Sequence, residues 1–86
     1  MERIHSTLCT AEQAGAFMRN SWKYAKVGGS HVRIHPPTSD VSVLPPGPVR
    51  YVAAVEILDT EDPTWGSADA AGIAAISEVF GQILKS

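Results

Sequence analysis

The sequence has one cysteine, no basic cluster and no long apolar run, and each of these shortages excludes a class of protein. Cys9 alone cannot form an internal disulfide, and a zinc site built on paired thiolates is excluded with it. No stretch approaches the ~18 consecutive apolar residues of a membrane span, so we expect no membrane partner. The first residues lack the apolar run of a secretory signal, which favours a cytoplasmic protein.

Motifs for nucleotide binding, metal-dependent proteolysis and serine hydrolysis are also missing, so no cofactor or metal site is expected. The formal net charge is −2. A protein that binds nucleic acid mainly through phosphates usually carries a basic patch, so a general nucleic-acid binder is disfavoured. A small local RNA site, or a protein partner that is itself basic, stays open.

The 86 residues are enough for a single domain, residues 1–86, near the size at which one core is only just sufficient. Thr10 and Gln13 form the pattern of a capping box and predict a helix from about residue 11 to 21–25. Apolar residues at three- and four-residue steps give that helix one apolar stripe, which includes Trp22. Asn20 and Ser21 could instead end that helix and leave residues 22–27 as a strand. A second helix is predicted over about 68–84, with Ser67 as its cap and with an apolar buried stripe: Ile73, Ile76, Phe80, Ile83 and Leu84.

Three strands are predicted between the helices, over residues 31–35, 41–44 and 49–58. Pro36 and Pro37 are expected to end the first of them, because proline cannot donate to a strand ladder. Residues 49–58 are apolar on both faces, which favours a central position or cover on both sides. The fold class is therefore α+β: a helix, an antiparallel sheet of three to four strands and a second helix (α-β-β-β-α), with both helices on one sheet face. Whether residues 3–8 add a strand is left open.

The strongest hint of a site is the alternation that follows the Gly28-Gly29 turn. Period-two spacing puts His31, Arg33 and His35 on one face of a strand, with Val32 and Ile34 pointing into the core. The two histidines would lie roughly 13 Å apart at ~3.3 Å per residue, too far to share one metal ion. A phosphate or carboxylate over Arg33 could be bound. A solvated polar face, a binding surface and a catalytic surface are the three interpretations.

A second candidate is the acidic loop with Asp59, Glu61 and Asp62, which could contact a basic partner or simply be solvated. Both tryptophans are predicted to belong to the core, and Trp65, beside a glycine, is the better candidate for an exposed contact residue. Cys9 is interpreted as a small, partly buried apolar residue.

One part of the chain resembles the HicA family of small bacterial toxins that cleave mRNA. The resemblance is carried by Asn20, Trp22, Gly29-Ser30-His31, His35-Pro36 and Val41-Ser42-Val43. It implies an arrangement similar to a double-stranded-RNA-binding domain, with His31 as a metal-independent general acid or base and the RNA 2′-hydroxyl as nucleophile. Arg33 or Lys26 would stabilise the phosphorane charge. The chain departs from the family in its mildly acidic charge and in residues 45–66, which add a strand and an acidic loop.

Two functions follow from these patterns. The first is a small non-enzymatic binding or inhibitor-type protein, analogous to anti-defence inhibitors of phages and other mobile elements. It would contact a protein or RNA-associated partner through the polar sheet face or the acidic loop. The sequence shows no complete set of catalytic residues, which favours a binding protein over an enzyme. The alternative is a HicA-like ribonuclease acting through His31. A homodimer formed by the second face of strand 49–58 is a further expectation.

Overall fold

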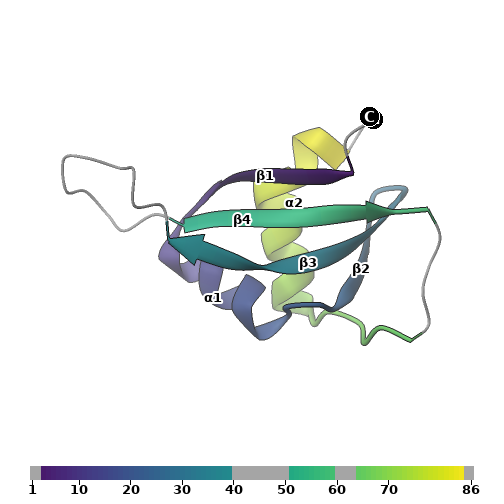
Figure 1. The fold of residues 1–86 in the computed structure, drawn as a ribbon, viewed down its shortest axis with the longest axis horizontal. Coiled ribbons are helices and arrows are strands. Elements are labelled where there is room, and N and C mark those ends of the chain that lie inside the picture. The colour runs from purple at the N-terminus through teal and green to yellow at the C-terminus, as the bar shows by residue number, and fades with distance from the viewer. Residues whose placement is uncertain (1–2, 40–50, 60–63, 85–86) are drawn as a thin grey trace.

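The computed structural model describes residues 3–39, 51–59 and 64–84, which form a four-stranded antiparallel sheet with two helices behind it (Figure 1). Along the chain the elements are β1 (Ile4–Cys9), α1 (Ala11–Arg19), β2 (Tyr24–Val27), β3 (Ser30–Ser39), β4 (Tyr51–Leu58) and α2 (Ala70–Leu84). The strand order is β1-β4-β3-β2. The predicted α+β class is confirmed, and the first residues do add a strand, β1, at one edge of the sheet.

At both ends of helix α1, side chains form hydrogen bonds with backbone groups that have no partner within the helix. Thr10 N donates to Gln13 Oε1 at 3.0 Å and Gln13 N donates to Thr10 Oγ1 at 3.2 Å, which is the predicted capping box. The helix stops at Arg19, short of the predicted 21–25, because Asn20 and Ser21 donate their side-chain hydrogen bonds to carbonyls of its last turn. The alternative end at Asn20 and Ser21 is therefore the one that the structure adopts.

Strand β3 continues through Pro36 and Pro37, where the sequence predicted its end. The pairing of β3 with β4 has an irregular register between His35 and Thr38, so both prolines lie at a bulge where ladder hydrogen bonds are interrupted. The strand predicted over 41–44 lies outside the described residues. Strand β4 pairs with β1 on one side and with β3 on the other, so its predicted central position is confirmed.

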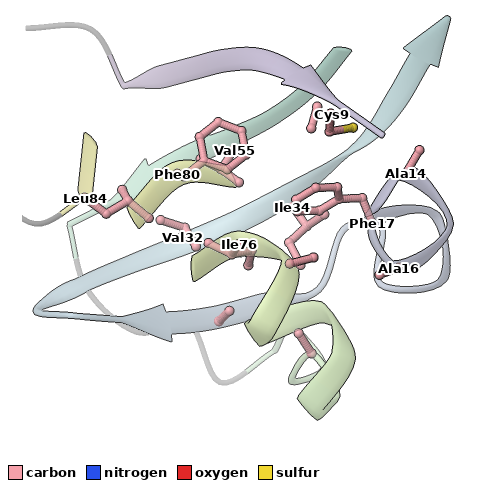
Figure 2. Packing of buried hydrophobic residues seen from close by; sticks show 14 residues of the cluster. Cys9, Ala14, Ala16, Phe17, Val32, Ile34, Val55, Ile76, Phe80 and Leu84 are labelled. Carbon is pink, nitrogen blue, oxygen red and sulfur yellow. The ribbon is translucent and has the colours of Figure 1, made fainter. Parts of the chain in front are cut away.

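The core lies between the helices and one face of the sheet (Figure 2). Val32, Ile34 and Val55 point from the sheet toward Phe17 of α1 and Phe80 of α2, whose rings meet edge to face at 6.1 Å between centroids. The predicted stripe of α2 is only partly right. Ile76, Phe80 and Leu84 are buried, but Ile73 and Ile83 are exposed, because the sheet covers a narrower stripe than helical spacing alone suggests.

The end of α1 and the start of α2 are joined by a buried polar contact. The Asn20 side chain, 0% exposed, donates to Asp69 Oδ1 at 3.1 Å and accepts from Asp69 N at 3.0 Å. Asp69 Oδ1 also accepts from Gly72 N at 2.8 Å, so Asp69 caps α2 and the predicted cap at Ser67 is wrong. The Gly72 N–H and the Asn20 amide lower the pKa of the Asp69 carboxyl.

Replacing each of the two glycines of α2 by alanine should have opposite effects on the stability of the fold. A Cβ at Gly72 would lie 2.6 Å from Asn20 Nδ2, and the buried amide cannot turn away without losing its hydrogen bonds. A Cβ at Gly81 meets nothing within 4 Å. We expect Gly72→Ala to destabilise the fold by about 1–3 kcal/mol, and Gly81→Ala to stabilise it by about 0.5–1 kcal/mol. Urea unfolding of the two variants measures both, and equal stabilisation would show that Asn20 does not need the space.

Candidate functional site

The sheet face opposite the helices, called the open face below, is directed toward the viewer in Figure 1. Val32 and Ile34 point into the core, so His31, Arg33 and His35 point to the open face, as the alternation predicted. Cross-strand pairing adds the neighbouring side chains on that face. The residues opposite these three are Leu58, Glu56 and Ala54 on β4, and Lys26 and Tyr24 on β2.

Glu56 lies at the centre of the polar row. Its Oε1 lies 3.2 Å from His35 Nε2 and 3.7 Å from an Arg33 guanidinium nitrogen, and all three side chains are partly buried. One carboxylate thus holds two neighbouring β3 side chains in fixed positions. Partial burial makes such contacts less exposed to screening by salt than a surface pair.

His31, Arg33 and His35 each also pack against one aromatic ring. The His31 ring stacks on Tyr24 at 5.6 Å, and Tyr24 Oη and His31 Nδ1 are 2.9 Å apart. The Arg33 guanidinium lies 4.1 Å from the centre of the Trp65 ring. The His35 ring lies 4.9 Å from that of Trp22. We call these three pairs the aromatic–polar row.

Backbone hydrogen bonds on the two sides of β2 bring two of the rings into place. Tyr24 N donates to Gly66 O and Ala68 N donates to Tyr24 O, both at 2.8 Å, which anchors the segment that carries Trp65. Trp22 N donates to Ile34 O at 2.6 Å, and Trp22 adopts a φ of 63°, a left-handed conformation that is rare for a bulky residue. Strain of this kind clusters at functional sites.

The remaining half of the open face is mostly apolar, with Ser6 between two large apolar side chains. Ile4 and Leu8 of β1 are 53% and 44% exposed. The register places these two side chains opposite Glu56 and Val52 of β4. Val52, Ala54 and Leu58 are partly exposed beside them, and they form the second face of the strand that was expected to support a homodimer. The open face therefore combines an apolar half on β1 and β4 with an aromatic–polar half on β3 and β2.

The structure reverses the prediction for the two tryptophans. Trp22 is 47% exposed, whereas Trp65 is partly buried beneath Arg33. Helical spacing suggested that Trp22 continues the buried stripe of the first helix, but that helix ends before it. Among the described residues, Arg33 Nε and Trp65 Nε1 are buried without a hydrogen-bond partner.

The acidic loop contributes little to the described site. Asp59 is exposed and forms an ion pair with Arg3 at 2.7 Å, at the start of β1 rather than in the aromatic–polar row. An exposed pair of this kind contributes little to the stability of a fold, because water and salt screen it. Glu61 and Asp62 lie outside the described residues, so their predicted role stays a prediction.

Cys9 is 5% exposed, and burial raises the pKa of its thiol, which disfavours the reactive thiolate. Across residues 3–39, 51–59 and 64–84, no group of three or more side chains is arranged to hold a metal ion. Within the same part of the chain, neither helix is long and apolar enough to span a membrane.

Sequence reasoning missed three members of the site: Tyr24, Glu56 and Trp22, which was assigned to the core. A signal for Tyr24 was present, because Trp22, Tyr24 and Lys26 alternate once the helix is ended at Asn20. Glu56 carried no comparable signal. Its role depends on the register of β4 against β3, which pairs it with Arg33.

Comparison of the chain with protein-family models, with curated proteins and with solved structures found no match.

The left-handed backbone at Trp22 can be tested by replacing the residue with glycine and with alanine. Both variants lose the ring, but only glycine adopts this φ without strain, so we expect Trp22→Gly to be more stable than Trp22→Ala by about 1 kcal/mol. Lys26 provides the control, because it lies on β2 and has no positive φ. At this position Lys26→Gly should be less stable than Lys26→Ala. Urea unfolding measures all four, and the same order at both positions would contradict the strain.

Proposed function

We propose that this chain is a non-enzymatic binding protein that docks a protein partner on its open face. The observation that carries the proposal is the aromatic–polar row, three aromatic side chains packed against Arg33 and two histidines beside an apolar half. Tryptophan, tyrosine and arginine are the residue types that dominate the energy of protein interfaces. Apolar surface next to them supports the same use.

A protein partner fits this face better than a nucleic acid does. The cations that β2 and β3 contribute to the open face are Lys26 and Arg33, and Arg33 is already close to the Glu56 carboxylate. Nucleic-acid affinity rests mainly on cations that neutralise phosphates, and two cations with an adjacent acid provide little of it. An aromatic and apolar surface with few net charges is instead typical of the centre of a protein interface.

The ordering of the row supports binding rather than structural filling. Arg33 is held by both Trp65 and Glu56, so little side-chain freedom would be lost when a partner covers it. Trp22 is 47% exposed and has a strained backbone, an arrangement that burial in the core does not explain. A partner that covers Trp22 and Arg33 would have its own surface blocked, which agrees with an inhibitor-type protein.

The proposal predicts that partner capture depends on the open face and not on the helices. Tagged wild-type protein should retain a partner that the double variant Trp22→Ala/Arg33→Glu loses by at least tenfold, because both anchors are removed. Ser77→Glu/Gln82→Glu, at two exposed positions of α2, changes the net charge by the same amount as Arg33→Glu and should bind like wild type. The readout is the dissociation constant of the purified pair.

Two results would contradict the open-face proposal. Equal binding by the double variant would place the interface elsewhere on the chain. Loss of capture after nuclease treatment would show that the ligand is a nucleic acid and not a protein.

A second candidate is the metal-independent ribonuclease, which one contact favours. The Tyr24 hydroxyl lies 2.9 Å from His31 Nδ1, and Lys26 lies directly opposite His31. If Nδ1–H donates to the tyrosine oxygen, Nε2 is unprotonated and can take the proton of a 2′-hydroxyl. The 2′-oxygen then attacks phosphorus, the bond to the 5′-oxygen breaks, and that oxygen takes a proton from water. Lys26 would stabilise the phosphorane charge.

The ribonuclease candidate predicts cleavage of an unstructured transcript by the purified protein in the presence of a metal chelator. His31→Ala should reduce the rate by at least about 100-fold, the usual contribution of a general acid or base. The separate variant Lys26→Ala should also cleave more slowly than wild type, but the pH profile of its cleavage rate should be unchanged. Absence of cleavage by the wild-type protein would eliminate this candidate and leave the binding proposal unaffected.

A further inference from the structure

In the part of the chain that the structure describes, β1 ends the sheet on one side, and the strand lacks the residues and the bulge that commonly keep edge strands from pairing. Natural edge strands are usually protected by lysine, other charges, proline or a bulge. Ile4–Cys9 reads IHSTLC, without an acid, a lysine, an arginine or a proline. Its register against β4 is unbroken from Ile4 opposite Glu56 to Cys9 opposite Tyr51, so it also lacks a bulge.

The hydrogen-bonding pattern shows which backbone groups of β1 face outward. Ile57 N donates to Arg3 O at 2.6 Å, and alternate residues of an antiparallel strand bond to the same neighbour. His5 and Thr7 therefore bond toward β4. The N–H and C=O groups of Ile4, Ser6 and Leu8 are directed to the outer side of the sheet.

The side chains of the same three residues are exposed on the open face. Ile4 is 53% and Leu8 44% exposed, and they lie symmetrically on either side of Ser6. Large apolar side chains at both ends of an unprotected edge strand favour a pairing site rather than a solvated edge.

We propose that β1 pairs antiparallel with β1 of a second copy of this chain, about a two-fold axis that passes beside Ser6. In this register Ser6 faces Ser6 of the second copy, and Ile4 faces Leu8 at both ends. The outward-directed N–H and C=O groups of all three residues then face the outward-directed groups of the second copy and can bond to them. The open faces of the two copies lie on the same side of one continuous sheet. This inference is independent of the proposed function, because it uses the β1 edge and not the aromatic–polar row.

A second copy fits this edge because the strand is complementary to itself. The centred register pairs apolar with apolar twice, places the small Ser6 side chain opposite its symmetry mate, and brings no like charges together. A shift by two residues in either direction leaves Ile4 or Leu8 opposite serine. A shift by one residue would pair side chains that belong on opposite sheet faces.

The test is the association state of the full chain. We expect sedimentation equilibrium to give a mass that rises with concentration toward twice the 9.2 kDa of one chain. Ser6→Lys should weaken the dimer at least tenfold, because two like charges would face each other at the axis. The fold should survive, since Ser6 is exposed and does not bond to β4. Ser77→Lys, an exposed position on α2, is the control of equal charge and should dimerise like wild type.

A cysteine at the axis tests the register. Directly opposite residues of a hydrogen-bonded pair have Cα atoms about 5.5 Å apart, within the range of a disulfide. Ser6→Cys should therefore form a covalent dimer on mild oxidation. The wild-type protein should not, because its only thiol, that of Cys9, is buried. A wild-type chain that stays monomeric at millimolar concentration overturns the proposal, as does a dimer unaffected by Ser6→Lys. Failure of Ser6→Cys to cross-link overturns the register.

Discussion

The buried amide of Asn20 is the contact on which the rest of the structure depends. Its Nδ2 donates to Ala16 O, at the end of α1, and to Asp69 Oδ1, while its Oδ1 accepts from Asp69 N at the start of α2. One side chain therefore ends one helix and orients the cap of the other. Removing it would take away a hydrogen-bond partner of Ala16 O in a buried position, and an unsatisfied buried group costs about 1–3 kcal/mol. Glycine at 72 is required because the amide occupies the space of a Cβ.

The same junction determines where the aromatic rings lie. Trp22 follows Asn20 by two residues and Trp65 precedes Asp69 by four, so joining the two helix ends brings both tryptophan segments to the β2 side of the sheet. The backbone hydrogen bonds of Tyr24 with Gly66 and Ala68 complete this arrangement. The open face thus obtains its two tryptophan rings from connections between elements and its tyrosine ring from β2, while β3 provides the polar partners. The contact between Asn20 and Asp69, on the helix side of the molecule, therefore helps to position the tryptophan rings of the open face on the opposite side.

Local patterns predicted the parts of the site that depend on neighbouring residues. The capping box of α1 and the alternation of residues 31–35 need only a few positions, and both were right. Trp22 was assigned to the core because helical spacing runs past Asn20, and nothing nearby shows that the Asn20 amide binds Asp69, 49 residues away. The role of Glu56 was missed for the same reason, because its contact with His35 spans 21 residues of the sequence. The error at Pro36 and Pro37 arose because a bulge accommodates residues that cannot donate.

The two halves of the open face serve the two proposals without competing. Partner docking rests on the aromatic–polar row of β3 and β2, whereas pairing of two copies uses the outer backbone groups of β1. In a continuous sheet with the order β2-β3-β4-β1 in each copy, the two β3 strands are five strand spacings apart, about 24 Å at ~4.8 Å each. The apolar halves would then meet in the middle and the two rows would lie toward the ends. A partner with two matching sites would gain from both at once, so dimerisation would strengthen binding without adding any contact to the row itself.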